Sequence, residues 1–174
     1  MLRNTKMIAL AAALALGASG AAVWAQNAGI NGHDSNAPVD YAADRIELQD
    51  KQQRVLLSGN VDIKQGDLRL RADRTIVDYL DQGGIKIQHI DALGGVRVTR
   101  GNENATADLA NYDFNRRIIT LVGNVVLQRD KDISRGNRLV IDLNAHQSGF
   151  VGAPGKDGAA GRVTGSFSVA QHKN

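Results

Sequence analysis

The segment Leu57-Ser-Gly-Asn-Val-Asp-Ile-Lys64 decides the fold, because its pattern is written more than once along the chain. Gly123-Asn-Val-Val-Leu127 repeats Gly59-Asn-Val-Asp-Ile63, and at the same offset Arg138-Leu-Val-Ile-Asp142 repeats Arg74-Thr-Ile-Val-Asp78. A supersecondary unit of this size cannot bury its apolar face alone, so we expect the copies to stack around one continuous apolar interior.

Apolar and polar residues alternate within the repeated stretches. Val55, Leu57, Val61 and Ile63 share one face of their stretch, and the residues between them are mostly polar. This period of two is typical of a strand with one buried face, and no stretch sustains the apolar stripe of an amphipathic helix. Only 4% of the residues are aromatic, so the core must be built from Val, Ile and Leu. The sequence therefore predicts a nearly all-β domain.

The alternation changes phase at two Ala-Asp pairs. Leu68 and Leu70 face the interior on even numbers and Val77 on odd numbers, so the slip falls at Ala72-Asp73; a second slip falls at Ala107-Asp108. A slip of one residue exchanges the two faces of a strand unless a bulge or corner absorbs it. We expect corners at both pairs and a bend at each Gly-Asn.

The two ends of the chain have different patterns. Residues 1–25 have the layout of a secretory signal peptide: a basic start, the apolar run Met7–Ala18, and Val23-Trp-Ala25 before the cleavage point. An uncleaved membrane anchor is the alternative interpretation. Residues 26–37 are expected to form a flexible leader, residues 38–169 the β-domain and residues 170–174 a polar tail. Within the domain, Val39–Leu48 and Arg162–Val169 are the expected edge strands, with a Gly/Ala loop over Gly149–Gly161 between the last strands.

Charge and chemistry narrow the function. Without Arg3 and Lys6, 19 basic residues remain against 18 acidic ones, a net charge of +1, and the interleaved signs do not favour a nucleic-acid partner. The chain has no cysteine, and its four histidines lack metal-ligand spacing. We therefore predict no catalytic residues, no metal site, no cofactor and no enzymatic activity.

Five aspartates recur in step with the repeat. A carboxylate pair for catalysis is conceivable, but recurrence favours a structural role, in which each Asp accepts hydrogen bonds beside a bend. These residues are Asp73, Asp78, Asp108, Asp113 and Asp142.

Several motifs, taken in order, resemble a known family. They are Val39-Asp-Tyr-Ala-Ala-Asp-Arg45, Ser58-Gly-Asn-Val61 with its copy Val122-Gly-Asn-Val125, Arg69-Leu-Arg-Ala-Asp-Arg74, Asn111-Tyr-Asp-Phe114 and Gly161-Arg-Val163. Over residues 38–169 the chain is similar to the OstA-like domain of lipopolysaccharide transport proteins. The resemblance implies a periplasmic, half-open antiparallel β-jellyroll, V-shaped in section, whose apolar interior holds the acyl chains of lipopolysaccharide. It also implies head-to-tail self-assembly, with an LptC-like inner-membrane protein at the N-terminal edge and an LptD-like outer-membrane protein at the C-terminal edge.

Together, the alternation and the resemblance indicate which residues line the interior. The candidates are Val39, Tyr41, Ile46, Val61, Ile63, Val77, Tyr79, Val96, Val98, Tyr112, Phe114, Leu127 and Ile141. Arg74, Arg97 and Arg138 are candidates for contacts with phosphate or sugar at the rim. Two alternatives stay open: the interior is a closed, dry core, or the protein is a structural β-module that scaffolds an envelope complex without carrying lipid. A leader and tail that cover the edge strands would keep the chain monomeric.

Overall fold

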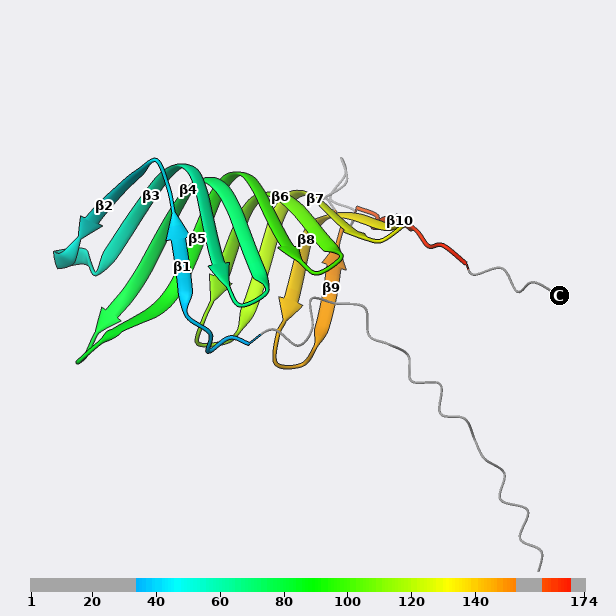
Figure 1. Cartoon of the computed structure of the whole chain (residues 1–174). Coiled ribbons are helices and arrows are strands. Elements are labelled where there is room, and N and C mark those ends of the chain that lie inside the picture. The colour runs from blue at the N-terminus through cyan, green and yellow to red at the C-terminus, as the bar shows by residue number, and fades with distance from the viewer. Residues whose placement is uncertain (1–33, 153–160, 170–174) are drawn as a thin grey trace, which may run out of the picture.

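A single antiparallel sheet of ten strands forms the domain (Figure 1). The computed structural model describes residues 34–152 and 161–169, so the expected signal peptide, most of the leader, the polar tail and most of the Gly/Ala loop lie outside it. The strands are β1 (Val39–Ala42), β2 (Arg45–Gln49), β3 (Arg54–Gln65), β4 (Leu68–Asp81), β5 (Ile85–Arg100), β6 (Glu103–Asp113), β7 (Ile118–Arg129), β8 (Asp132–Asp142), β9 (Gln147–Val151) and β10 (Thr164–Ser166). The described helical structure is one short 3-10 turn, Asp50–Gln52. The predicted all-β, half-open antiparallel jellyroll is confirmed.

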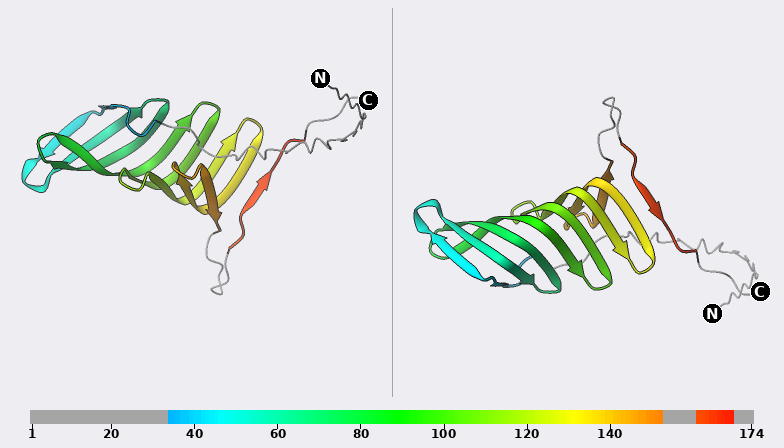
Figure 2. Two further views of the ribbon diagram at one scale, coloured as in Figure 1. Left: turned by 90° about the horizontal axis from the view of Figure 1, so that it is seen from below. Right: turned by 90° about the horizontal axis from the view of Figure 1, so that it is seen from above.

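Each long strand bends once, so the sheet has two walls. Strands β3 to β8 pair with their neighbours in sequence, and both ends of the sheet are split: β1 and β2 pair with the two halves of β3, while β10 and β9 pair with the two halves of β8. We call the two halves the β1–β10 wall and the β2–β9 wall after their edge strands. Figure 2 shows the bent strands following one another from β1 and β2 at one end to β10 at the other.

The bends lie at the positions where the sequence repeats. The pairing register shifts between Ser58 and Val61 in β3, between Arg71 and Arg74 in β4, and at the matching places in β5, β6 and β7. At each bend, one strand has a single residue outside the regular pairing and the next strand has two. One-residue and two-residue corners therefore alternate along the line where the two walls join. The single residues are Asp44, Asp73, Asp108 and Asn137. The pairs are Gly59-Asn60, Gly94-Gly95 and Gly123-Asn124, and every residue of these pairs has a positive φ. The predicted Ala-Asp corners and Gly-Asn bends are confirmed.

Aspartate and glycine are the residues that these corners require. Each of the pairs begins with a glycine at a φ of 76° to 81°, a backbone conformation that is costly for other residues. The aspartate of the preceding corner packs directly on this glycine. Asp44 Oδ2 then accepts a hydrogen bond from Asn60 Nδ2 at 2.8 Å, and Asp108 Oδ2 accepts one from Asn124 Nδ2 at 2.9 Å. Of the predicted corner aspartates, Asp108 thus has the expected structural role, with a side-chain amide rather than a backbone N–H as donor.

Replacing a corner glycine is expected to destabilise the fold. A Cβ at Gly123 would overlap Asp108 Oδ2 at a φ of +81°, so we expect Gly123→Ala to lower the free energy of unfolding by about 2–4 kcal/mol in urea titrations. Gly101→Ala is the control for φ alone, because Gly101 has a φ of +54° and no atom near its added Cβ; it should cost about 1–2 kcal/mol. Equal losses in the two variants would contradict a role for the aspartate contact.

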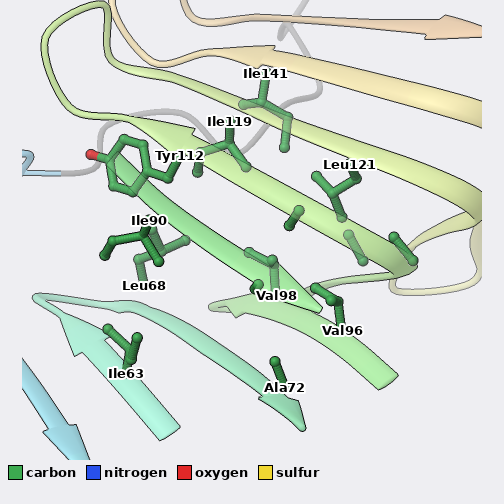
Figure 3. Close-up of a cluster of buried hydrophobic side chains, with 14 of the residues drawn as sticks. Ile63, Leu68, Ala72, Ile90, Val96, Val98, Tyr112, Ile119, Leu121 and Ile141 are labelled. Atoms are coloured by element: carbon green, nitrogen blue, oxygen red, sulfur yellow. The ribbon is translucent and has the colours of Figure 1, made fainter. Parts of the chain in front are cut away.

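The inner faces of both walls meet in one hydrophobic core (Figure 3). A row of directly paired residues crosses the β2–β9 wall: Leu57, Thr75, Ala92, Ala110, Leu121, Leu139 and Phe150. The small side chains in the middle of this row let the opposite wall approach closely. Val96, Val98 and Val125 of the β1–β10 wall are almost completely buried there.

Three expectations about element boundaries were wrong. Val39–Leu48 is two strands, because the chain turns a corner at Ala43-Asp44. Gly149, Phe150 and Val151 belong to strand β9 rather than to a loop, because Phe150 packs against the core and outweighs the local glycines. The last strand is limited to Thr164–Ser166 within the expected Arg162–Val169.

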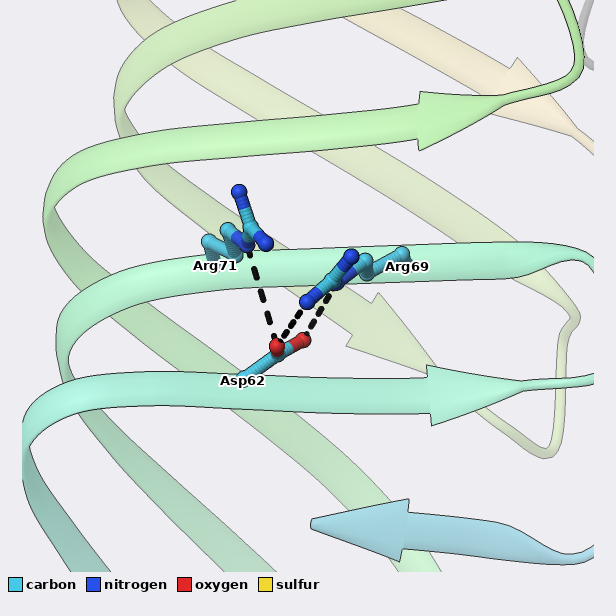
Figure 4. A network of polar contacts seen from close by, with 3 residues as sticks. All are labelled: Asp62, Arg69 and Arg71. Carbon is cyan, nitrogen blue, oxygen red and sulfur yellow. Dashed lines mark hydrogen bonds and ion pairs between the residues drawn. The ribbon is translucent and has the colours of Figure 1, made fainter. Parts of the chain in front are cut away.

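Charged pairs on the outer faces tie neighbouring strands together. Asp62 of β3 accepts hydrogen bonds from the Arg69 guanidinium of β4 (Figure 4). Its Oδ2 atom also lies 3.7 Å from Nε of Arg71. The hydrogen bond from Arg69 is the main cause that lowers the pKa of Asp62. Asp78, Asp113 and Asp142 are similarly engaged, by Arg54 and by backbone N–H groups of adjacent turns. These contacts agree with a structural role for the recurring aspartates.

Candidate functional site

An apolar groove opens between the two walls at the N-terminal end of the sheet. Its cavity of about 240 Å³ is lined by ten residues of strands β1 to β5: Val39, Tyr41, Leu48, Val55, Leu57, Ile63, Val77, Tyr79, Ile85 and Ile87. Three of them are strongly exposed, Tyr41 at 56%, Leu48 at 67% and Ile85 at 73%. Large apolar side chains gathered around an open cavity are typical of a site that binds an apolar ligand or another protein.

The groove narrows towards the middle of the sheet. Its inner end is a cavity of about 20 Å³ beside Leu68, Ile90, Tyr112 and Phe114. The rings of Tyr112 and Phe114 stack there, with centroids 4.1 Å apart. Burial raises the pKa of the Tyr112 hydroxyl, and the nearby Ser35 opposes this shift. Beyond this point the walls touch, and Leu139 has no exposed surface. The interior is therefore an open groove at the N-terminal end and a packed core further along.

The candidate lining residues divide between these two regions. Seven of them border the groove or its inner end: Val39, Tyr41, Ile63, Val77, Tyr79, Tyr112 and Phe114. Val61, Val96, Val98 and Ile141 are buried in the packed core, and Leu127 packs against that core. Ile46 of β2 is paired with Leu57 of β3 and is partly exposed, but it does not border the cavity of the groove. Their contact with lipid stays a prediction.

The predicted lining left out five of the ten groove residues, Leu48, Val55, Leu57, Ile85 and Ile87, and the basic rim residues were misplaced. The alternation of Ile85-Lys-Ile-Gln88 could have identified Ile85 and Ile87, because it marks the start of β5. Arg74, Arg97 and Arg138 are exposed and alternate with buried residues, so they lie on the outer faces of the walls, away from the groove. Lys86 and Arg117 are the basic residues that border the opening.

A short segment before β1 crosses the open side of the V. Gln65, at the end of β3, donates from Nε2 to the carbonyl oxygens of Ser35 at 3.0 Å and Ala37 at 3.1 Å. Arg117, in the turn between β6 and β7, donates from Nη2 to Asn36 Oδ1 at 3.3 Å. We call Asp34–Ala37 the strap, because it joins the β1–β10 wall to the β2–β9 wall. These residues were expected to belong to a flexible leader, yet they have defined partners on both walls.

Both ends of the sheet leave a strand edge unpaired. Among the described residues, β1 and β2 pair only with β3, and β9 and β10 only with β8. Apolar residues just after β10 are strongly exposed to solvent, including Phe167 at 76% and Val169 at 87%. Edges of this kind pair readily with further strands.

Two other kinds of site were sought in the described part of the chain. No three His, Cys, Asp or Glu side chains are arranged there to hold a metal ion. No helix in the same ranges has the length and hydropathy needed to cross a membrane.

Comparisons with known proteins agree with this architecture. Residues 42–147 match the family described as LptA/(LptD N-terminal domain) LPS transport protein. An uncharacterized protein of Rhizobium meliloti (strain 1021) is 25% identical over 136 residues, which cover 74% of this chain and 70% of that protein.

Two further similarities connect the chain to lipopolysaccharide assembly proteins. The LPS-assembly protein LptD of Nitrosomonas europaea is 34% identical over 100 residues, which cover 56% of this chain but only 13% of LptD. The crystal structure of LptH from Pseudomonas aeruginosa, described as the LptA-homologous periplasmic component of the lipopolysaccharide transport device, superposes with a TM-score of 0.67. It covers 79% of this chain and all of LptH at 18% identity, which is a likeness of fold.

Proposed function

The chain belongs to the family of LptA and the LptD N-terminal domain, which are lipopolysaccharide transport proteins, and we propose that it is an LptA-like periplasmic carrier that bridges the inner and outer membranes. In this proposal the acyl chains of lipopolysaccharide occupy the apolar groove between the two walls. The sugars and phosphates stay at the open side of the V, in water.

The groove at the N-terminal end is the observation that carries the proposal. All ten residues that line it are aliphatic or aromatic, and they come from five strands of both walls. Each CH₂ group buried in such a site contributes about 0.8 kcal/mol, so several acyl chains can be held without a specific polar contact. The cavity of about 240 Å³ admits part of one lipid; further chains require the walls to move apart.

The free edges support the bridging role. An LptC-like protein of the inner membrane would pair with the β1–β2 edge, and an LptD-like protein of the outer membrane with the β9–β10 edge. Further copies of the chain would join in the same orientation, since unlike ends that pair generate an open filament. The secretory layout of residues 1–25 supports export to the periplasm.

Cross-linking from inside the groove tests lipid binding. We expect a photo-reactive phenylalanine analogue at Tyr41 to capture lipopolysaccharide in cells, because Tyr41 is half exposed within the groove. The matched control is the same analogue at Leu109, which is 44% exposed on the outer face of the β2–β9 wall. Similar capture from both positions would contradict an apolar groove as the lipid site.

The packed middle of the interior favours a second candidate, a structural module that scaffolds an envelope complex without lipid. The groove has a cavity of about 240 Å³, whereas the cavity beside Tyr112 and Phe114 has only about 20 Å³. In this case native mass spectrometry of the purified protein would show no bound lipid, and the Tyr41 cross-linker would capture only proteins.

A further inference from the structure

We propose that Lys86 and Arg117 form a phosphate-binding rim beside the groove, which selects amphiphiles with a phosphorylated headgroup over neutral ones with the same acyl chains. This inference rests on the proposed function, because it assigns the headgroup of a lipid whose chains lie in the groove. The chemistry recognised is a phosphate monoester, carried by a lipid rather than free in solution.

A second cavity, next to the groove, provides the site. Its volume is about 470 Å³, and it lies under the strap at the open side of the V. Its lining is Ser35, Asn36, Ala37, Val39, Gln65, Ile85, Lys86, Ile87, Phe114, Asn115 and Arg117. Val39, Ile85 and Ile87 also line the groove, so the two cavities are adjacent and have these three residues in common. A lipid with its chains against these three residues therefore has its headgroup at the strap.

The charge of this lining is one-sided. Among the described residues, Lys86 and Arg117 are the only charged ones that border this cavity, and no described Asp or Glu does so. Within the described part of the chain neither cation forms an ion pair, whereas Arg54 and Arg129 bind carboxylates. A third cavity, on the outer side of the corners, shows the contrast: Arg71 is accompanied there by Asp62 and Asp73. A positive lining without a counter-charge favours an anionic ligand.

The contacts of Arg117 leave it suited to phosphate. Its hydrogen-bond acceptor is the neutral Asn36 Oδ1 at 3.3 Å, which is a long hydrogen bond. A guanidinium binds phosphate through two parallel charge-assisted hydrogen bonds, which are stronger than a bond to an amide. Asp34 lies in the strap and Asp113 lies four residues before Arg117, and both carboxylates already accept backbone N–H groups, of Asn36 and of Arg116.

The strap gives the cavity its shape. Gln65 is only 4% exposed and donates to the carbonyl oxygens of Ser35 and Ala37, which fixes the strap at the cavity that Phe114 and Ile87 also line. The cavity is consequently apolar towards the groove and polar towards the strap. This is the arrangement that the junction between an acyl chain and a charged headgroup needs.

Binding measurements with matched lipids test the inference. The double variant Lys86→Gln, Arg117→Gln should bind bis-phosphorylated lipid A in detergent about tenfold more weakly than the unmodified protein, since two hydrogen bonds to a charged group are lost. Its affinity for the dephosphorylated lipid with the same chains should not change. The phosphate-dependent difference should also shrink as salt is raised.

Matched controls separate the rim from general charge. The double variant Arg74→Gln, Arg97→Gln removes the same charge from the outer faces and should bind both lipids as the unmodified protein does. Thermal unfolding of every variant checks the fold, and Lys86→Gln alone, at an exposed position, gives a second measurement if the double variant is unstable. Inorganic phosphate is the third probe and should not compete at concentrations near those of the lipid.

Each outcome has one meaning. Equal losses for both lipids, or no loss for either, would overturn the phosphate rim and leave the groove intact. Competition by inorganic phosphate at lipid concentrations would indicate a site for the free anion instead of a headgroup. An unmodified protein that binds neither lipid would overturn the proposed function itself, and the rim with it.

Discussion

Leu48→Glu is expected to weaken the binding of lipopolysaccharide by at least about tenfold without unfolding the protein. Leu48 lines the groove at its open end and is 67% exposed, so the domain does not depend on its burial. A bound acyl chain would remove the new carboxylate from water, and the desolvation of an unpaired charge costs more than the 1.4 kcal/mol that a tenfold change requires. Equilibrium binding to purified lipopolysaccharide measures the effect.

The control places the same charge outside the groove. Leu109→Glu changes an apolar side chain of comparable exposure, 44%, on the outer face of the β2–β9 wall. It should leave the affinity for lipopolysaccharide within about twofold of the unmodified protein, because no lipid contact is proposed there. If the two glutamates weaken binding equally, the apolar outer face rather than the groove is the lipid site.

The bent strands could be predicted because their causes are local. A phase slip in the alternation is visible wherever both halves of a strand have apolar residues, as at Leu70 and Val77 around Ala72-Asp73. The glycine that begins each two-residue corner is required by a positive φ. Strand β9 was missed because its evidence is not local: Phe150 is held in place by Leu139 on the neighbouring strand.

The groove itself could be predicted only in part. Alternation shows which side chains face inward, but it does not show how far apart the two walls stand. Val98 and Val77 have the same pattern in the sequence, yet Val98 is buried where the walls meet and Val77 borders the open groove. The separation depends on the corner geometry and on the small residues Ala92 and Ala110 in the middle of the sheet.

The strap and the basic rim had no signal in the sequence. Ser35 and Asn36 lie in a polar stretch with the composition of a flexible leader. Their position depends on Gln65 and Arg117, which are distant in sequence and belong to different walls. Contacts between residues so far apart are set by the folded sheet, and one sequence does not reveal them.

Copies of the chain are expected to join through unlike ends, with β10 of one copy beside β1 of the next. The corner pattern supports this direction. The N-terminal edge has a one-residue corner at Asp44, between β1 and β2. At the C-terminal edge, between β9 and β10, the alternation calls for a two-residue corner, and there Gly152 contacts Gly161. A contact between unlike ends continues the alternation of corners, and a contact between like ends interrupts it.

Disulfide cross-linking tests the direction, since the chain has no cysteine of its own. If the free edge of β10 pairs antiparallel with the free edge of β1, as β3 pairs with the other edge of β1, Ser166 and Asp40 lie on adjacent strands. Oxidising a mixture of Asp40→Cys and Ser166→Cys chains should therefore give abundant dimers, and each variant alone should give few. A chain with both substitutions should form a ladder of longer species on a non-reducing gel.

Mixing with a Leu109→Cys chain controls for random collision, because Leu109 lies on an outer face away from both edges. Dimers of Asp40→Cys alone at the level of the mixture would indicate that like ends pair. Cross-linking no higher than the Leu109→Cys level would indicate covered edges and a monomer, as expected if the leader and tail protect them. The bridge requires abundant dimers of the mixed Asp40→Cys and Ser166→Cys chains, because acyl chains can pass between copies only where the interior of one copy continues into that of the next.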